Sequence, residues 1–116
     1  GDNNLHPDRY LPNLKIFYFP FDVDDKSGPF KYALGSHKIS KEYLNFFKHN
    51  KDFVFDERNN NAKQFLKNVK NFIVRKNTIV IALTNGFHGR KKFEIMKDRV
   101  HLMFTYPEYN FLSMLN

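Results

Sequence analysis

Residues 78–90 read Thr-Ile-Val-Ile-Ala-Leu-Thr-Asn-Gly-Phe-His-Gly-Arg, and this stretch decides the fold class. Five of its first six residues are apolar and four of the six are β-branched, which is typical of a buried strand. Asn85-Gly86 is the strongest short hairpin signal in the chain, because both residues tolerate the positive φ angles of a two-residue turn. The pattern therefore predicts a strand, a hairpin turn, and a returning strand that starts at Phe87–Arg90 with His88 near its beginning.

Further strands are expected on both sides of this stretch. Each candidate is rich in aromatic or β-branched residues and is bounded by turn formers. The candidates are Leu14–Phe21, Phe30–Leu34, Phe72–Arg75 and Arg99–Tyr106. Because strands gather at both ends and do not alternate with helices, we expect an antiparallel sandwich or barrel rather than a parallel sheet.

The middle of the chain has a different pattern. Ser40 stands where an N-cap belongs, and Lys41–Phe47 carries apolar residues at helical spacing. A second short helix is expected over Ala62–Val69. Residues 40–70 therefore form a helical and loop insertion between β-rich ends. The fold class we predict is mainly β (α+β), a jelly-roll or double-stranded β-helix of the cupin-like kind.

Length and composition restrict the function classes. A chain of 116 residues is expected to form one domain, 1–116, and the absence of cysteine excludes a disulfide framework and any thiolate metal site. No apolar run is long enough to cross a bilayer, and no signal peptide is visible, so we expect a soluble, cytoplasmic protein without a membrane partner. The net charge of +7 either attracts anions or simply keeps the protein soluble. Nucleic acid is not expected as a partner, because no dense Lys/Arg run is interleaved with aromatic residues.

His6-Pro7-Asp8 is the motif that carries candidate metal chemistry. In an extended segment, the period of two places the imidazole and the carboxylate on the same face. An H-x-D motif alone is a weak signal, and a third ligand must come from a distant segment. His88, just past the predicted turn, is the candidate. Two histidines and one carboxylate leave three positions on an octahedral iron(II) for a chelating cosubstrate and dioxygen.

Four further residues are candidates for binding an anion near this metal. Arg99, on the predicted last strand, can face the same cavity and bind a carboxylate through two hydrogen bonds. Lys15 and Phe17 share one face of a predicted strand and either border the cosubstrate pocket or are a surface lysine packed on an aromatic strand. Arg90 either contacts an anionic substrate or is simply exposed.

These motifs together resemble the phytanoyl-CoA hydroxylase (phytanoyl-CoA dioxygenase)-like family of iron(II)- and 2-oxoglutarate-dependent oxygenases. The similar segments are His6-Pro7-Asp8, the strand Leu14–Phe19, Asp22-Val23, the turn Ser27-Gly28-Pro29-Phe30, the turn Leu34-Gly35-Ser36-His37-Lys38, and the block Asn77–Arg90 followed by Arg99. The order and the spacing of these segments both agree with the family pattern.

The resemblance implies that His6, Asp8 and His88 bind Fe(II) and that Arg99 binds 2-oxoglutarate. The implied reaction is oxidative decarboxylation of 2-oxoglutarate to succinate, coupled to hydroxylation of a small-molecule substrate by O2. Because relatives that halogenate lack the carboxylate ligand, Asp8 favours hydroxylation.

The chain departs from this family at its start and at one turn. Only five residues precede His6, whereas family members have helices and at least one strand before the motif, so we expect the first strand to be missing. Ala33-Leu34 stands where relatives often have a proline before Gly35, a neutral difference. The alternative function is a truncated, non-catalytic β-helix domain that binds a metal, a small anion or a partner chain, with a homodimer completing the sheet.

Overall fold

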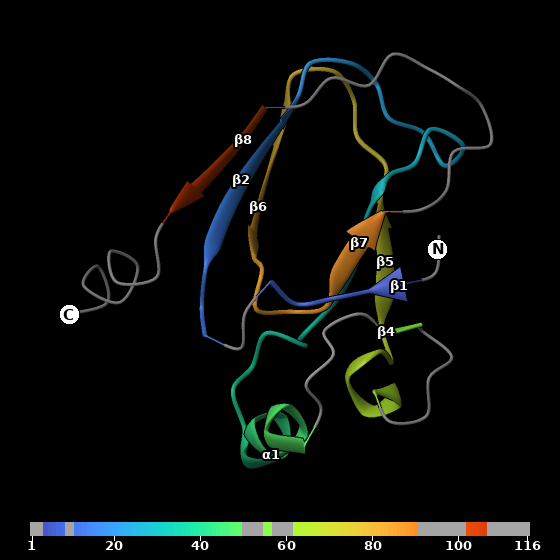
Figure 1. Cartoon of the computed structure of the whole chain (residues 1–116). Helices are drawn as coiled ribbons and strands as arrows, with labels where there is room; N and C mark the ends of the chain where they lie inside the picture. The colour runs from blue at the N-terminus through green and yellow to red at the C-terminus, as the bar shows by residue number, and fades with distance from the viewer. Residues whose placement is uncertain (1–3, 9–10, 50–54, 57–61, 91–101, 107–116) are drawn as a thin grey trace.

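Two antiparallel sheets face each other in this computed structural model, which describes residues 4–8, 11–49, 55–56, 62–90 and 102–106 (Figure 1). The protein is mainly β, with one α-helix in the described part. In chain order the elements are β1 (Asn4–Leu5), β2 (Leu14–Phe19), β3 (Phe30–Ala33), α1 (Lys41–His49), β4 (Phe55–Asp56), the 3-10 turn η1 (Lys63–Phe65), β5 (Val69–Phe72), β6 (Thr78–Leu83), β7 (His88–Arg90) and β8 (Leu102–Tyr106).

The first sheet has the strand order β6-β2-β8. Phe17 of β2 lies opposite Val80 of β6 and Met103 of β8, and both pairings are antiparallel. Phe17 and Phe19 are buried, whereas Ile79 and Ile81 on β6 are largely exposed. This alternation is the consequence of the two-residue period of a strand, which turns every second side chain toward the other sheet.

The second sheet has the strand order β5-β3-β7, and the chain before β2 extends it. An isolated antiparallel bridge joins His6 to His88 of β7, and the preceding strand β1 pairs with β4. From β1 to β3 and again from β5 to β8, successive strands alternate between the two sheets. Residues at the ends of strands that are far apart in the sequence therefore lie close together in the structure.

The core between the sheets is aromatic. Its buried members are Phe17, Phe19, Val23, Phe30, Tyr32 and Ala82. Phe30 is central to this core, because its ring centroid lies 5.0 Å from that of Phe17 and 5.8 Å from that of Phe72. The many rings of the sequence thus fill the space between two sheets, as large apolar side chains do in β-sandwiches.

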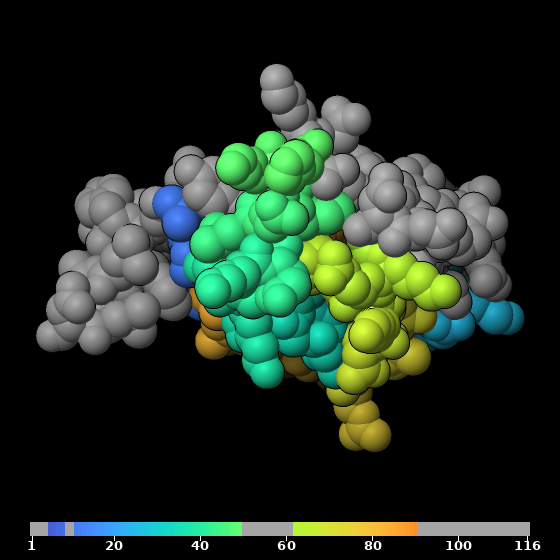
Figure 2. All heavy atoms as spheres, turned by 90° about the horizontal axis from the view of Figure 1, so that it is seen from below, coloured from blue at the N-terminus to red at the C-terminus, as the bar shows by residue number. Residues whose placement is uncertain are grey.

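Helix α1 and the turn η1 cover one end of the molecule (Figure 2). Phe46 of α1 packs against Phe65 of η1 and against Phe87, with ring centroids 5.1 and 6.1 Å apart, respectively. The helix begins as expected, because Ser40 Oγ accepts a hydrogen bond from the backbone N–H of Tyr43 at 3.1 Å. No helix within the described segments is long and apolar enough to cross a membrane.

Three local expectations differ from the structure. Asn85-Gly86 does not close a hairpin, because β6 pairs with β2 whereas β7 pairs with β3, so the turn carries the chain from one sheet to the other. The helix expected over Ala62–Val69 is only the 3-10 turn η1, because Val69 begins β5 opposite Ala33. The strand expected over Phe72–Arg75 accordingly lies earlier, at Val69–Phe72. Residue 99, expected to begin the last strand, lies outside the described residues.

Candidate metal centre

The backbones of two histidines lie side by side at the junction of β1 and β7. The backbone N–H of His6 donates to His88 O at 2.8 Å, and the backbone N–H of His88 donates to His6 O at 3.0 Å. Asp8 is fixed two residues later, because its backbone N–H donates to Thr84 O at 2.7 Å. These bonds attach the H-x-D segment to both ends of the β6–β7 turn, so three residues that are distant in sequence form one site.

The side chains of His6, Asp8 and His88 converge. One ligand atom from each lies within 4.8 Å of the others. Asp8 Oδ1 is the common point, 3.7 Å from His6 Nε2 and 3.5 Å from His88 Nε2. The His88 side chain is only 7% exposed and that of Asp8 is 21% exposed, whereas that of His6 is 41% exposed. The cluster is therefore deep on the His88 side and open to solvent on the His6 side.

A backbone carbonyl fixes the orientation of the His88 ring. His88 Nδ1 lies 2.9 Å from Gly86 O, and a carbonyl oxygen only accepts, so Nδ1 carries the proton. In the neutral imidazole, Nε2 then carries the lone pair, and this lone pair faces Asp8. Histidines that bind metals use the same arrangement, in which the second ring nitrogen donates to a carbonyl and fixes the tautomer.

Lys15, on the inward face of β2, supplies the positive charge of the site. Its Nζ lies 2.6 Å from Asp8 Oδ2, and its side chain is 18% exposed. Burial by itself would raise the pKa of Asp8, but hydrogen bonding and charge from His88 and Lys15 outweigh burial, so this pKa lies well below its usual range. Burial, and then the neighbouring His88, lower the pKa of His6 below its ordinary value. At neutral pH the site therefore offers an ionised carboxylate and a neutral His6.

The donor set fits a divalent metal of the first transition row. Imidazole and carboxylate ligands suit iron, manganese and zinc, and two histidines with one carboxylate leave open positions on an octahedral ion. Adjacent ligand atoms of such an ion lie roughly 3 Å apart, since each is about 2.1 Å from the metal. The observed separations of Asp8 Oδ1 from the two Nε2 atoms, 3.5 and 3.7 Å, are slightly wider than this spacing.

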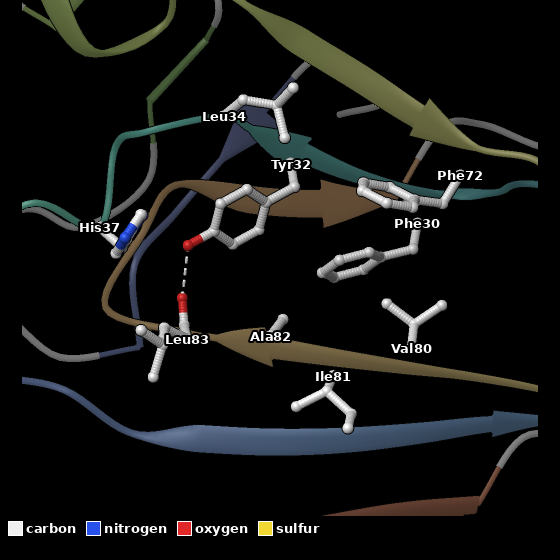
Figure 3. Close-up of a pocket in the computed structure, with 9 residues that line it drawn as sticks. All are labelled: Phe30, Tyr32, Leu34, His37, Phe72, Val80, Ile81, Ala82 and Leu83. Atoms are coloured by element: carbon white, nitrogen blue, oxygen red, sulfur yellow. Dashed lines mark hydrogen bonds between the residues drawn. The ribbon is translucent and has the colours of Figure 1, made fainter. Parts of the chain in front are cut away.

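An open cavity of about 280 Å³ lies between β6 and the β3–β5 side of the second sheet (Figure 3). The lining is almost entirely apolar, and His37 is its one titratable group apart from Tyr32. Tyr32 Oη donates to Leu83 O at 2.6 Å, which uses the hydroxyl proton within the wall. Phe30 and Tyr32 line the cavity and also contact the His88 ring, at centroid distances of 5.8 and 6.4 Å, so the cavity and the metal cluster share these two side chains.

The remaining predicted site residues are not all placed at this cluster. Phe17 lies in the core between the sheets and reaches the cluster only through Phe30, which contacts His88. Arg90 is two residues beyond His88 at the end of β7; it is the exposed residue of that strand, yet partial burial of its guanidinium lowers its pKa. Arg99 lies outside the described residues.

Sequence reasoning assigned no chemistry to the Asn-Gly turn, yet Thr84 and Gly86 at that turn position two of the candidate ligands. Gly86 provides the carbonyl that orients His88, and Thr84 provides the carbonyl that holds Asp8. Thr84 is itself fixed by Asn13, whose Nδ2 donates to Thr84 Oγ1 at 3.1 Å. A histidine two residues after a glycine turn is the only local signal that pointed to this arrangement.

Comparison with known proteins identifies no relative. No protein-family model, no curated protein and no solved structure matches this chain.

Proposed function

We propose that the chain is an iron(II)- and 2-oxoglutarate-dependent oxygenase domain that hydroxylates a small-molecule substrate. In this proposal His6, Asp8 and His88 hold Fe(II), and Arg99 with Lys15 binds the carboxylates of 2-oxoglutarate. Bound together, the metal, the cosubstrate and O2 supply the oxidising chemistry for C–H hydroxylation. Asp8 occupies a ligand position that a halide would need, which favours hydroxylation over halogenation.

One observation carries this proposal: three side chains that can each donate an electron pair to a metal, those of His6, Asp8 and His88, bring one ligand atom each within 4.8 Å of the others. Because Gly86 O accepts the Nδ1 proton, the neutral imidazole of His88 can offer its Nε2 lone pair to a metal, at a point 3.5 Å from Asp8 Oδ1. His6 adds a third donor from the solvent side.

The strand order supports the finer fold of the proposal, a jelly roll or double-stranded β-helix. The chain crosses repeatedly between two sheets, as in a jelly roll. The strand orders are β6-β2-β8 in one sheet and β5-β3-β7 in the other, with the β1 segment continuing beyond β7. Sites of this kind lie where the strand ends of both sheets meet, and His6 and His88 lie at such an end. The 280 Å³ cavity beside His88 offers room for an apolar part of the substrate.

The proposal is tested by anaerobic titration of the whole chain with Fe(II) and then with 2-oxoglutarate. The expected result is the weak visible charge-transfer band of the chelated complex. We expect His88→Ala to abolish this band, because the most buried ligand is lost and metal affinity falls by roughly 100-fold or more. The matched control is His49→Ala, which removes an exposed imidazole at the end of α1.

Three outcomes separate the possibilities. A band that is present in the wild type and in His49→Ala but absent in His88→Ala supports the site. A well-folded wild-type protein without the band contradicts it. Metal and cosubstrate binding without succinate formation, when O2 is admitted, would identify the alternative function, a metal-binding domain without catalysis.

A further inference from the structure

Lys15 competes directly for the carboxylate that the metal needs. Its Nζ lies 2.6 Å from Asp8 Oδ2, while the other oxygen, Oδ1, faces the two imidazoles. Lys15 reaches this position from β2 in the first sheet, whereas both histidines lie at the strand ends of the second sheet. The first sheet thus presents an ammonium group, and the second sheet two imidazoles, to the same carboxylate.

The charge balance of the site changes when a metal binds. Without metal, the ammonium and the carboxylate neutralise each other in a pocket where both side chains are about four-fifths buried. A divalent ion at Oδ1 draws the carboxylate charge toward itself, and the sum over metal, Asp8 and Lys15 becomes two positive charges. A largely buried cation is costly when it has no counter-charge, so the loaded site requires an anion beside Lys15.

We propose that Lys15 is an exchangeable counter-ion, which binds Asp8 in the metal-free protein and a carboxylate ligand of the metal in the loaded protein. This inference rests on the proposed metal centre and adds a coupling to it. Because binding free energies are reciprocal, an anion that pairs with Lys15 tightens metal binding, and the metal tightens anion binding by the same factor.

The experiment measures the affinity of the whole chain for Co(II) by competition with a chromophoric chelator, with and without oxalate. Lys15→Met is expected to bind Co(II) about tenfold more tightly than the wild type without oxalate, because the competing ammonium is gone. In the same variant, the factor by which oxalate increases the Co(II) affinity is expected to be about tenfold smaller than in the wild type. Lys15→Arg keeps the charge and is expected to keep that tightening.

Lys26→Met is the matched control, because it removes one positive charge from an exposed turn and leaves the site unchanged. If Lys15→Met is poorly folded, Lys15→Gln replaces it. If the wild type and Lys15→Met bind Co(II) with the same affinity and respond equally to oxalate, the exchange is overturned but the metal centre is not. Weaker Co(II) binding by the variant would overturn the exchange as well. A wild type that binds no Co(II) would overturn the metal centre and the exchange together.

Discussion

At the scale of single residues, Gly86 has no room for a side chain. A Cβ atom placed there would lie 2.0 Å from Tyr32 Oη and 3.1 Å from Ser36 Oγ. The hydroxyl of Tyr32 is itself held by Leu83 O, so it cannot move away without losing a hydrogen bond. The glycine is therefore required for the close packing of the turn beside His88.

We expect Gly86→Ala to lower the free energy of unfolding by about 2–3 kcal/mol, because overpacking displaces Tyr32 and the turn. It should also weaken metal binding about tenfold or more, because Gly86 O orients the His88 ring. The measurements are urea unfolding and Co(II) titration. Gly35→Ala is the control: φ is +82° with open space around it, so it should cost about 1 kcal/mol and leave metal affinity unchanged. Equal effects of both variants on metal affinity would contradict the role of Gly86.

The sequence allowed the candidate ligands to be named, and the structure brings them together, but the groups around them could not be predicted. His6, Asp8 and His88 are chemically recognisable, and their spacing indicates a site. The pairing of Lys15 with Asp8 depends on β2 lying across from the H-x-D segment, which is a tertiary arrangement. Local sequence carries no information on such a contact, so Lys15 remained ambiguous between a pocket residue and a surface lysine.

At the scale of elements, α1 supports the turn that precedes the candidate metal ligand His88. The buried Tyr43 donates through Oη to Asn85 O at 2.8 Å, and Phe46 packs on Phe87. The prediction of α1 from sequence succeeded because the cap, the apolar spacing and the tertiary contacts all favour the same helix. The predicted hairpin failed because an Asn-Gly turn specifies a change of direction, not which strands pair.

We expect Phe46→Ala to lower the free energy of unfolding by about 3–5 kcal/mol, because a buried aromatic side chain leaves a cavity under α1. Leu44→Ala changes the exposed face of the same helix and should cost less than about 1 kcal/mol. Urea unfolding of both variants compares them directly. Similar losses in the two would mean that α1 does not depend on its packing against the turn.

At the scale of the whole molecule, the arrangement of strands could not be derived from local patterns. Leu14 pairs with Leu83 and also with Tyr106, so the first sheet is built from contacts between distant segments. Hydrophobic alternation indicates that a strand has one buried face, but several strand orders satisfy the same alternation. The mainly β class was therefore predictable, whereas the strand order required the structure.

The stability of the metal-free protein should fall as the pH is lowered below 6.5. The pKa of His6 lies below its ordinary value of 6.5 because the folded protein buries the ring beside His88, so the unfolded chain binds more protons in this window. The contribution of His6 to the free energy of unfolding is therefore fully present above pH 6.5. It is lost as the pH falls toward the pKa of His6 in the folded protein. The carboxylate of Asp8, whose pKa is also lowered, contributes a further loss only below its ordinary value of 3.8. Thermal unfolding between pH 7.5 and 5.0 with a chelator present measures the effect, and His6→Asn should flatten it. An unchanged pH dependence in that variant would place the responsible group elsewhere.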